Sequence, residues 1–123
     1  IIATELSMDE KIEKALATAN FIATLSNQKR ILLEEYNQKL VYYADGATFK
    51  ITPGYIAFIK AMVDMGNTTD VGLVDSNNLP VMISDLEEML QNLIEVYNEV
   101  TTEYVSKYNE IKSKRKIADI VNL

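Results

Sequence analysis

Residues 40–53 read LVYYADGATFKITP, and this stretch decides the fold that the sequence predicts. Two runs of β-forming residues, Leu40–Tyr43 and Thr48–Ile51, flank Asp45-Gly46. Because Asp and Gly tolerate the positive φ angles of a tight turn, the pattern predicts a β-hairpin over 40–52. Thr52-Pro53 has the form of an N-cap followed by Pro in the first helical turn, so a helix is expected directly after the hairpin.

A short helix and a second hairpin are predicted next along the chain. Residues 53–66 are heavily apolar and end at Gly66, a common helix stop, so we expect a short helix that is buried on most of its circumference. The β-forming runs 71–74 and 80–83 bracket Asp75-Ser76-Asn77-Asn78, which predicts a hairpin over 70–83 with Pro80 at an edge. The turn could be an oxygen-ligand loop, but it lacks the Gly and the Glu of a calcium-binding EF-hand loop.

Long helical patterns lie on both sides of this central region. Ser7 and Glu10 form a capping-box pattern, and an apolar stripe then runs through a helix predicted over 8–40. The polar residues 26–30 interrupt the stripe, so the alternative is two helices that meet near Asn27. Ser84 and Glu87 form a second capping-box pattern before a helix predicted over 85–113. Residues 114–123 form either further helix or a tail that docks elsewhere.

These elements predict one α+β domain over 1–123, in which two long amphipathic helices enclose two β-hairpins joined by a short buried helix. The expected core consists of apolar positions from every predicted element: Ile12, Ile22, Leu32, Phe49, Ile51, Ile56, Ile59, Val63, Leu73, Val81, Leu86, Leu90 and Leu93.

Composition excludes several classes of chemistry. The 123 residues contain no His and no Cys, which excludes Ser-His and Cys-His nucleophiles, disulfides and the common zinc sites. No phosphate-binding glycine loop occurs, and no apolar run approaches the roughly 18 residues of a membrane span. We therefore expect no cofactor, no metal, no membrane association and a cytoplasmic location, although a chain that begins at Ile1 leaves open whether a signal peptide was removed.

The net charge of −6 is unevenly distributed. Residues 64–106 contain nine acidic residues and no Lys or Arg, which disfavours nucleic acid. This acidic block could face a basic protein partner, or it could simply be a solvated surface. The basic cluster at Lys112, Lys114, Arg115 and Lys116 could contact nucleic acid, or it could complement the dipole at a helix C-terminus.

Two further groups of side chains suggest function. The paired Glu87 and Glu88 and the row Glu95, Glu99 and Glu103 could hold a divalent cation, as in a metal-dependent nucleotide hydrolase, although the row is expected to point largely to solvent. Interaction residues are predicted on the apolar and aromatic seam of the last helix, at Tyr97, Tyr104, Tyr108 and Ile111. That seam is available either to the first helix or to another subunit, and the second case predicts a homodimer.

Two resemblances accompany these patterns. The segments 42–53, 73–81 and 85–87 resemble small proteins encoded by T4-like phages of marine bacteria, across about residues 36–116. The resemblance implies a phage-encoded protein in the host cytoplasm or the virion and supplies no catalytic residues. The order of elements is also similar to that of a prefoldin subunit, but the helix at 53–66 is longer and more apolar than a prefoldin linker.

The sequence thus predicts a non-enzymatic interaction or assembly protein, phage-encoded, that self-associates through its long helices. The metal-dependent hydrolase and a nucleic-acid-binding accessory protein are the alternatives.

Overall fold

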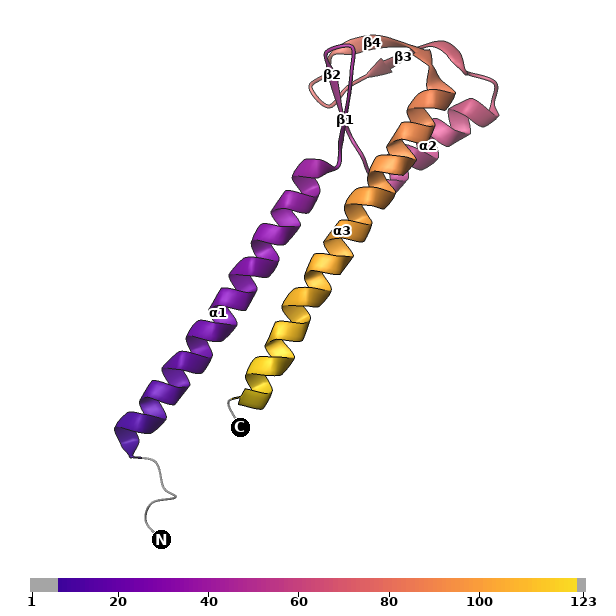
Figure 1. Cartoon of the computed structure of the whole chain (residues 1–123). Helices are drawn as coiled ribbons and strands as arrows, with labels where there is room; N and C mark the ends of the chain where they lie inside the picture. Colours follow the sequence, from indigo (N-terminus) through magenta and orange to yellow (C-terminus); the bar gives the residue numbers. More distant parts are fainter. Residues whose placement is uncertain (1–6, 122–123) are drawn as a thin grey trace.

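The computed structural model describes residues 7–121, with side chains up to Lys114, and it confirms the predicted α+β architecture (Figure 1). The elements are α1 (Met8–Lys39), β1 (Val41–Ala44), β2 (Ala47–Lys50), α2 (Pro53–Asp64), β3 (Thr69–Val74), β4 (Pro80–Asp85) and α3 (Leu86–Val121). Helices α1 and α3 run antiparallel and side by side, and the hairpins and α2 gather at one end of this pair (Figure 1). We call that end the head.

The first hairpin forms as the sequence predicts. Strands β1 and β2 pair antiparallel from Val41 opposite Lys50 to Ala44 opposite Ala47. Asp45 and Gly46 connect them with φ angles of 51° and 80°, and positive φ at both central residues is the requirement of a type I′ turn. The second hairpin, β3–β4, is a separate two-stranded sheet.

Helix α2 begins and ends at the predicted signals, but its burial differs from the prediction. The Thr52 side chain accepts the Tyr55 N–H, and beyond the last turn the N–H groups of Gly66 and Asn67 donate to Val63 and Met62. This is a Schellman ending, for which Gly66 supplies a φ of 92°. The prediction that α2 is buried on most of its circumference is wrong: Ile59 is fully buried, whereas Phe58 is 50% exposed, because the head covers one face only.

Asp75 joins the two hairpins. Its Oδ1 atom accepts the N–H groups of Asn77 and Leu79 at 2.9 and 2.7 Å, and its Oδ2 atom accepts the Thr48 N–H of β2 at 2.9 Å. The Ser76 N–H donates in turn to the Thr48 carbonyl at 2.9 Å. The loop at 75–78 is therefore a turn stabilised by its own carboxylate, and it is fastened to the edge of the first hairpin.

Both long helices have identifiable starts. The predicted capping box at Ser7 and Glu10 is present, and α1 continues without interruption through Asn27, so the two-helix alternative is wrong. At α3 the cap lies one residue later than predicted, because β4 extends through Asp85, whose carboxylate accepts the Glu88 N–H at 3.1 Å. No helix within residues 7–121 combines the length and hydrophobicity needed to cross a bilayer.

Helix α3 extends past the predicted end at 113. Its backbone is helical to Val121, which matches the further-helix alternative for the predicted tail. The side chains of Arg115, Lys116 and the residues after them, and the last two positions of the tail, lie outside the described residues.

The hydrophobic core lies in the head and on the head-proximal part of α3. Its buried residues are Leu40, Ala47, Phe49, Ile51, Ile59, Val71, Leu73, Ile83, Leu86, Met89 and Leu93, while Ile56, Val63, Val81 and Leu90 pack against them partly buried. Leu32 is also buried, on the face of α1 toward α3. Ile12 and Ile22 are the two wrong core predictions, because they lie on the part of α1 farthest from the head and are 50% and 55% exposed.

Candidate interaction surface

The tyrosines that the sequence singles out lie between α1 and α3 of the same chain. The Tyr104 ring packs edge-on against Tyr36 of α1, with ring centroids 4.4 Å apart, and stacks on Tyr108 at 6.3 Å. The Tyr36 hydroxyl is 2.9 Å from the Thr101 hydroxyl, and the Lys29 ammonium lies 5.3 Å from the centre of the Tyr108 ring. The first helix therefore already covers this part of the seam.

The other two residues predicted on the seam are also partly covered. Tyr97 packs partly buried against the core of the head, and Ile111 is half-buried farther along α3. Since all four residues are partly buried within a single chain, the seam offers little free surface to another subunit.

Near the head, ion pairs connect α1 and α3 beside the aromatic seam. Glu103 pairs with Lys107 at 2.8 Å and with Lys39 of α1 at 3.2 Å, and these hydrogen bonds hold the pKa of Glu103 below its usual value. The residues around them line a cavity of only about 10 Å³, which has room for one water molecule at most. This point of the fold links the helices and has no space for a substrate.

The predicted carboxylate row does not converge on one point. Glu103 is engaged with two lysines, while Glu95 and Glu99 on the same helix are exposed, as are Glu87 and Glu88. Among the described residues, no group of three or more acidic side chains is arranged to hold a metal ion.

Several acidic residues of the block at 64–106 contact other groups of the same chain. Asp64 pairs with Lys60, Asp75 fastens the hairpins, Asp85 caps α3 and Glu103 joins the helices. Several of its acids therefore act within the chain, which leaves less of the block for a basic protein partner. In the basic cluster, Lys112 and Lys114 are exposed, and Arg115 and Lys116 lie outside the described side chains.

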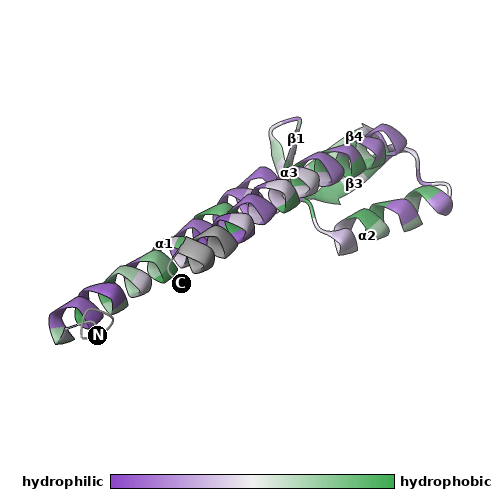
Figure 2. Ribbon diagram, turned by 60° about the horizontal axis from the view of Figure 1, so that its bottom comes forward, coloured by the Kyte–Doolittle hydropathy of each residue, from purple (hydrophilic) through white to green (hydrophobic). Residues whose placement is uncertain are grey.

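An exposed apolar surface lies on the half of α1 away from the head, the end of which extends past α3 (Figures 1 and 2). Every residue from Met8 to Asn20 is exposed. The apolar and small residues here recur at intervals of three and four, so they share one side of the helix. We call them the α1 stripe: Met8, Ile12, Leu16, Ala19, Ile22 and Ala23. Its four large side chains are at least half exposed.

The charges next to the α1 stripe are as informative as its apolar residues. Residues 15–28 contain no charged side chain, so about four turns of a helix that is exposed over most of this length, apart from the buried Leu25, lack the charges that normally face solvent. A free helix with an apolar side and an uncharged middle is typical of a surface that another helix covers. The sequence pattern could have revealed this, but reading residues 8–40 as one continuous buried stripe concealed it.

A second apolar surface lies on the outer face of the β3–β4 hairpin. Gly72 opposite Met82 and Val74 opposite Pro80 line an open hollow there. Val74 and Met82 are 60% and 62% exposed. The hollow is wide and shallow, and it lacks a charged or hydrogen-bonding side chain that would select a ligand.

Comparison with protein-family models, with curated proteins and with solved structures finds no match to this chain. The functional interpretation therefore depends on the surfaces of the molecule itself.

Proposed function

We propose that this protein is a non-enzymatic interaction and assembly module that self-associates through the exposed part of its first helix. The observation that carries the proposal is the α1 stripe, where Met8, Ile12 and Leu16 are at least half exposed on the part of α1 in which every residue from 8 to 20 is exposed. Exposing such a continuous apolar face to water is unfavourable, and pairing it with another helix removes it from water.

The proposal shifts the self-association surface from the one that the sequence favours. Tyr104 and Tyr108 are covered by Tyr36 and Lys29 of α1, so they contribute to the stability of each protomer. The α1 stripe lies past that contact and remains free. Burying a large aliphatic side chain is worth about 1.5–3 kcal/mol, so a few such residues on each side are enough to offset the entropy of association.

The resemblance to proteins of T4-like phages fits an assembly role. On that basis we propose the host cytoplasm or the virion as the place where the protein acts. No observation in the described residues favours the metal-dependent hydrolase or the nucleic-acid-binding alternative, since the carboxylates are dispersed or paired.

Light scattering during size exclusion tests the proposal. At about 50 µM, a concentration at which a micromolar complex is populated, we expect the wild type to elute as a dimer. The double variant Ile12→Glu and Leu16→Glu places two negative charges on the α1 stripe, and we expect it to elute as a monomer. Its helix content should be unchanged, because both side chains are exposed in the protomer. The matched control is Ile31→Glu, whose side chain is 46% exposed but lies away from the α1 stripe, and it should remain a dimer. A wild type that is monomeric at this concentration overturns the proposal.

A further inference from the structure

The two edges of the first hairpin differ in what covers them. On the β2 edge, the Thr48 N–H donates to Asp75, the Thr48 carbonyl accepts the Ser76 N–H, and the Lys50 N–H donates to the Ser76 hydroxyl at 3.2 Å. On the other side β1 has no neighbouring strand, because the sheet consists of β1 and β2 alone. An edge strand with unpaired N–H and C=O groups is a template on which a further strand can form.

The register shows which backbone groups of β1 are unpaired. The Ile51 N–H donates to the Leu40 carbonyl at 2.9 Å, and bonded pairs alternate with non-bonded pairs along an antiparallel ladder. Val41 and Tyr43 are therefore at non-bonded positions, and their N–H and C=O groups point away from β2. Within the described residues neither position has a backbone partner beyond β2.

A hollow of about 210 Å³ lies along this free edge, and we call it the β1 hollow. One wall consists of four consecutive residues, 42–45, and includes no residue of β2. Because successive residues of a strand face opposite sides of the sheet, the hollow runs along the edge of β1 and not over one face of the hairpin. The opposite wall consists of residues 83–85 at the end of β4 and of Glu88 and Met89 in α3.

Strand β4 presents unpaired backbone groups to the same hollow. The Asp75 N–H donates to the Leu79 carbonyl at 2.9 Å, so the alternation along the second ladder makes Ile83 and Val71 a bonded pair. Ser84 is then at a non-bonded position, and its N–H and C=O groups point away from β3. An extended segment in the β1 hollow therefore has a strand edge on each side.

The carboxylates that line the β1 hollow give it negative charge. Asp45, Asp85 and Glu88 are exposed, and no Lys or Arg is among the lining residues. Asp85 accepts the Glu88 N–H, but neither Asp45 nor Glu88 forms an ion pair within the described residues. Lys50, the one basic residue of the first hairpin, lies opposite Val41 at the other end of the ladder. The hollow is therefore complementary to an occupant with positive side chains.

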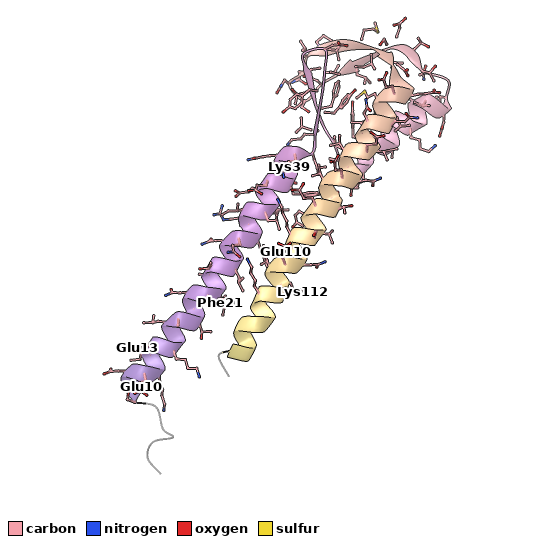
Figure 3. All side chains as sticks on the ribbon, viewed as in Figure 1. Glu10, Glu13, Phe21, Lys39, Glu110 and Lys112 are labelled. Carbon is pink, nitrogen blue, oxygen red and sulfur yellow. The ribbon has the colours of Figure 1, made fainter. Side chains whose placement is uncertain are left out.

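This chain does not supply such an occupant. Every Lys and Arg except Lys50 lies within a helix, so none belongs to an extended segment that is free to pair. Figure 3 shows Lys112 of the basic cluster on the part of α3 away from the head, and Lys39 at the end of α1 next to the head. Lys39 is already paired with Glu103. A second copy of the chain is subject to the same limits, so the occupant belongs to a different protein.

We propose that the β1 hollow binds an extended segment of a different protein that carries Lys or Arg at alternate positions. The segment adds a strand to the first hairpin through the backbone groups of Val41 and Tyr43. Its positive side chains share one face, because side chains alternate along a strand, and they pair with Asp45, Asp85 and Glu88. This surface is in the head, so the inference does not rest on self-association through the α1 stripe.

Titration with a capped hexapeptide of alternating Lys and Val, followed by amide NMR, tests the proposal. At low salt we expect a dissociation constant below about 1 mM, with the amide signals of Tyr43 and Ser84 shifting most. The same peptide N-methylated along its backbone keeps its charge but loses its donors, and it should bind at least about tenfold more weakly. A peptide of alternating Glu and Val should not bind. Absence of binding by the Lys peptide, or equal binding by its N-methylated form, overturns the proposal.

A charge-neutral pair of substitutions tests the role of the carboxylates. Asp45→Asn with Glu88→Gln should raise the dissociation constant about fivefold at low salt, and Asn accepts the positive φ that the turn requires. The matched control, Glu95→Gln with Glu99→Gln, removes the same charge from exposed positions of α3 outside the hollow and should change the constant less than about twofold. Equal weakening by both pairs would show that the peptide responds only to net charge, which overturns the proposal.

The wild type without peptide provides the last comparison. The Tyr43 amide signal should be independent of protein concentration, because no second copy occupies the β1 hollow. A concentration-dependent shift at Tyr43 would mean that this edge pairs with another copy of the chain, which overturns the proposal. Each of these results is distinct from the oligomeric state measured by light scattering, so self-association through the α1 stripe stands or fails separately.

Discussion

Asp75 illustrates how much of the head depends on one side chain. It is only 7% exposed, yet it is charged, and its two oxygens accept three backbone N–H groups from two hairpins. The bond from the Thr48 N–H, supported by those from Leu79 and Asn77, lowers the pKa of Asp75 from its usual value in spite of burial. The ionised form is therefore favoured in the folded protein.

This shift predicts an acid dependence of stability. A carboxyl group whose pKa is lower in the folded state stabilises the fold above its unfolded pKa of about 3.9, and this contribution is lost as the pH falls through the folded pKa. Asp75→Asn replaces one accepting oxygen by a donor, so it should lower the urea midpoint at pH 7. The difference from the wild type should shrink as the pH falls below about 4. The control Asp70→Asn, which is exposed and also has a positive φ, should lower the urea midpoint at pH 7 less than Asp75→Asn does. A difference between wild type and Asp75→Asn that is equal at pH 7 and pH 3 would contradict the prediction.

Gly46 and Gly72 give a prediction about backbone conformation. Neither has an atom within 4 Å of an added Cβ, but Gly46 has a φ of 80° and Gly72 does not have a positive φ. Gly46→Ala should therefore cost about 1–2 kcal/mol of unfolding free energy from left-handed strain alone. Gly72→Ala should cost nothing measurable or slightly stabilise the protein by restricting the unfolded chain. Denaturant titration of both variants compares them, and equal effects would be inconsistent with a type I′ turn at Asp45-Gly46.

At the scale of the elements, the pairing of α1 with α3 combines an aromatic contact with polar ones. Tyr36 reaches both the Tyr104 ring and the Thr101 hydroxyl, while Lys39 reaches Glu103. These contacts connect residues more than 60 positions apart in the chain, so they fix the register of the two helices relative to each other.

A double-mutant cycle tests that register by measuring the coupling free energy between one residue of α1 and one of α3. Replacing Tyr36 and Tyr104 by Ala, singly and together, should reveal a coupling free energy of about 1 kcal/mol, the value typical of edge-to-face aromatic pairs. Tyr43, which is 73% exposed in β1, serves as the control partner for Tyr36 and should show no coupling. Additive effects at Tyr36 and Tyr104 would mean that the helices do not pair in this register.

Neighbouring residues on α3 test which face of this helix supports the head. Leu93 is fully buried, whereas Ile94 is 38% exposed. Leu93→Ala should cost about 2–5 kcal/mol through lost burial and a cavity, and Ile94→Ala should cost less than about 1 kcal/mol. The unfolding free energies of both variants decide this, and a larger loss at Ile94 would place the opposite face of α3 toward the core.

At the scale of the whole molecule, the apolar residues fall into two groups, one buried in the core and one exposed on α1. Those near the head form one core, and those of the α1 stripe remain outside it. The stripe makes no contribution to the core, so covering it with a second copy, as we propose, would leave the fold of each protomer unchanged.

Association should be visible as stabilisation by mass action. Because pairing occurs only between folded chains, the thermal midpoint of the wild type should rise over about a hundredfold range of protein concentration. The Ile12→Glu and Leu16→Glu double variant should unfold at one temperature throughout this range, near that of the dilute wild type. If the midpoint of the wild type is also independent of concentration, the protein does not self-associate under these conditions.

The sequence by itself determined the elements, because their signals are local. Asp45-Gly46, Thr52-Pro53, Gly66 and the Ser7–Glu10 box each act through backbone conformation or hydrogen bonds a few residues apart, and each is found where it was predicted. Only the tertiary structure decided which faces are covered. Ile12 and Leu32 belong to the same apparent stripe, yet Ile12 is exposed and Leu32 is buried, because α3 lies along one part of α1 and leaves the other part free. Periodicity shows that a face is apolar, but what covers it depends on contacts between residues distant in the chain, such as Tyr36 with Tyr104, and such contacts leave no local signal.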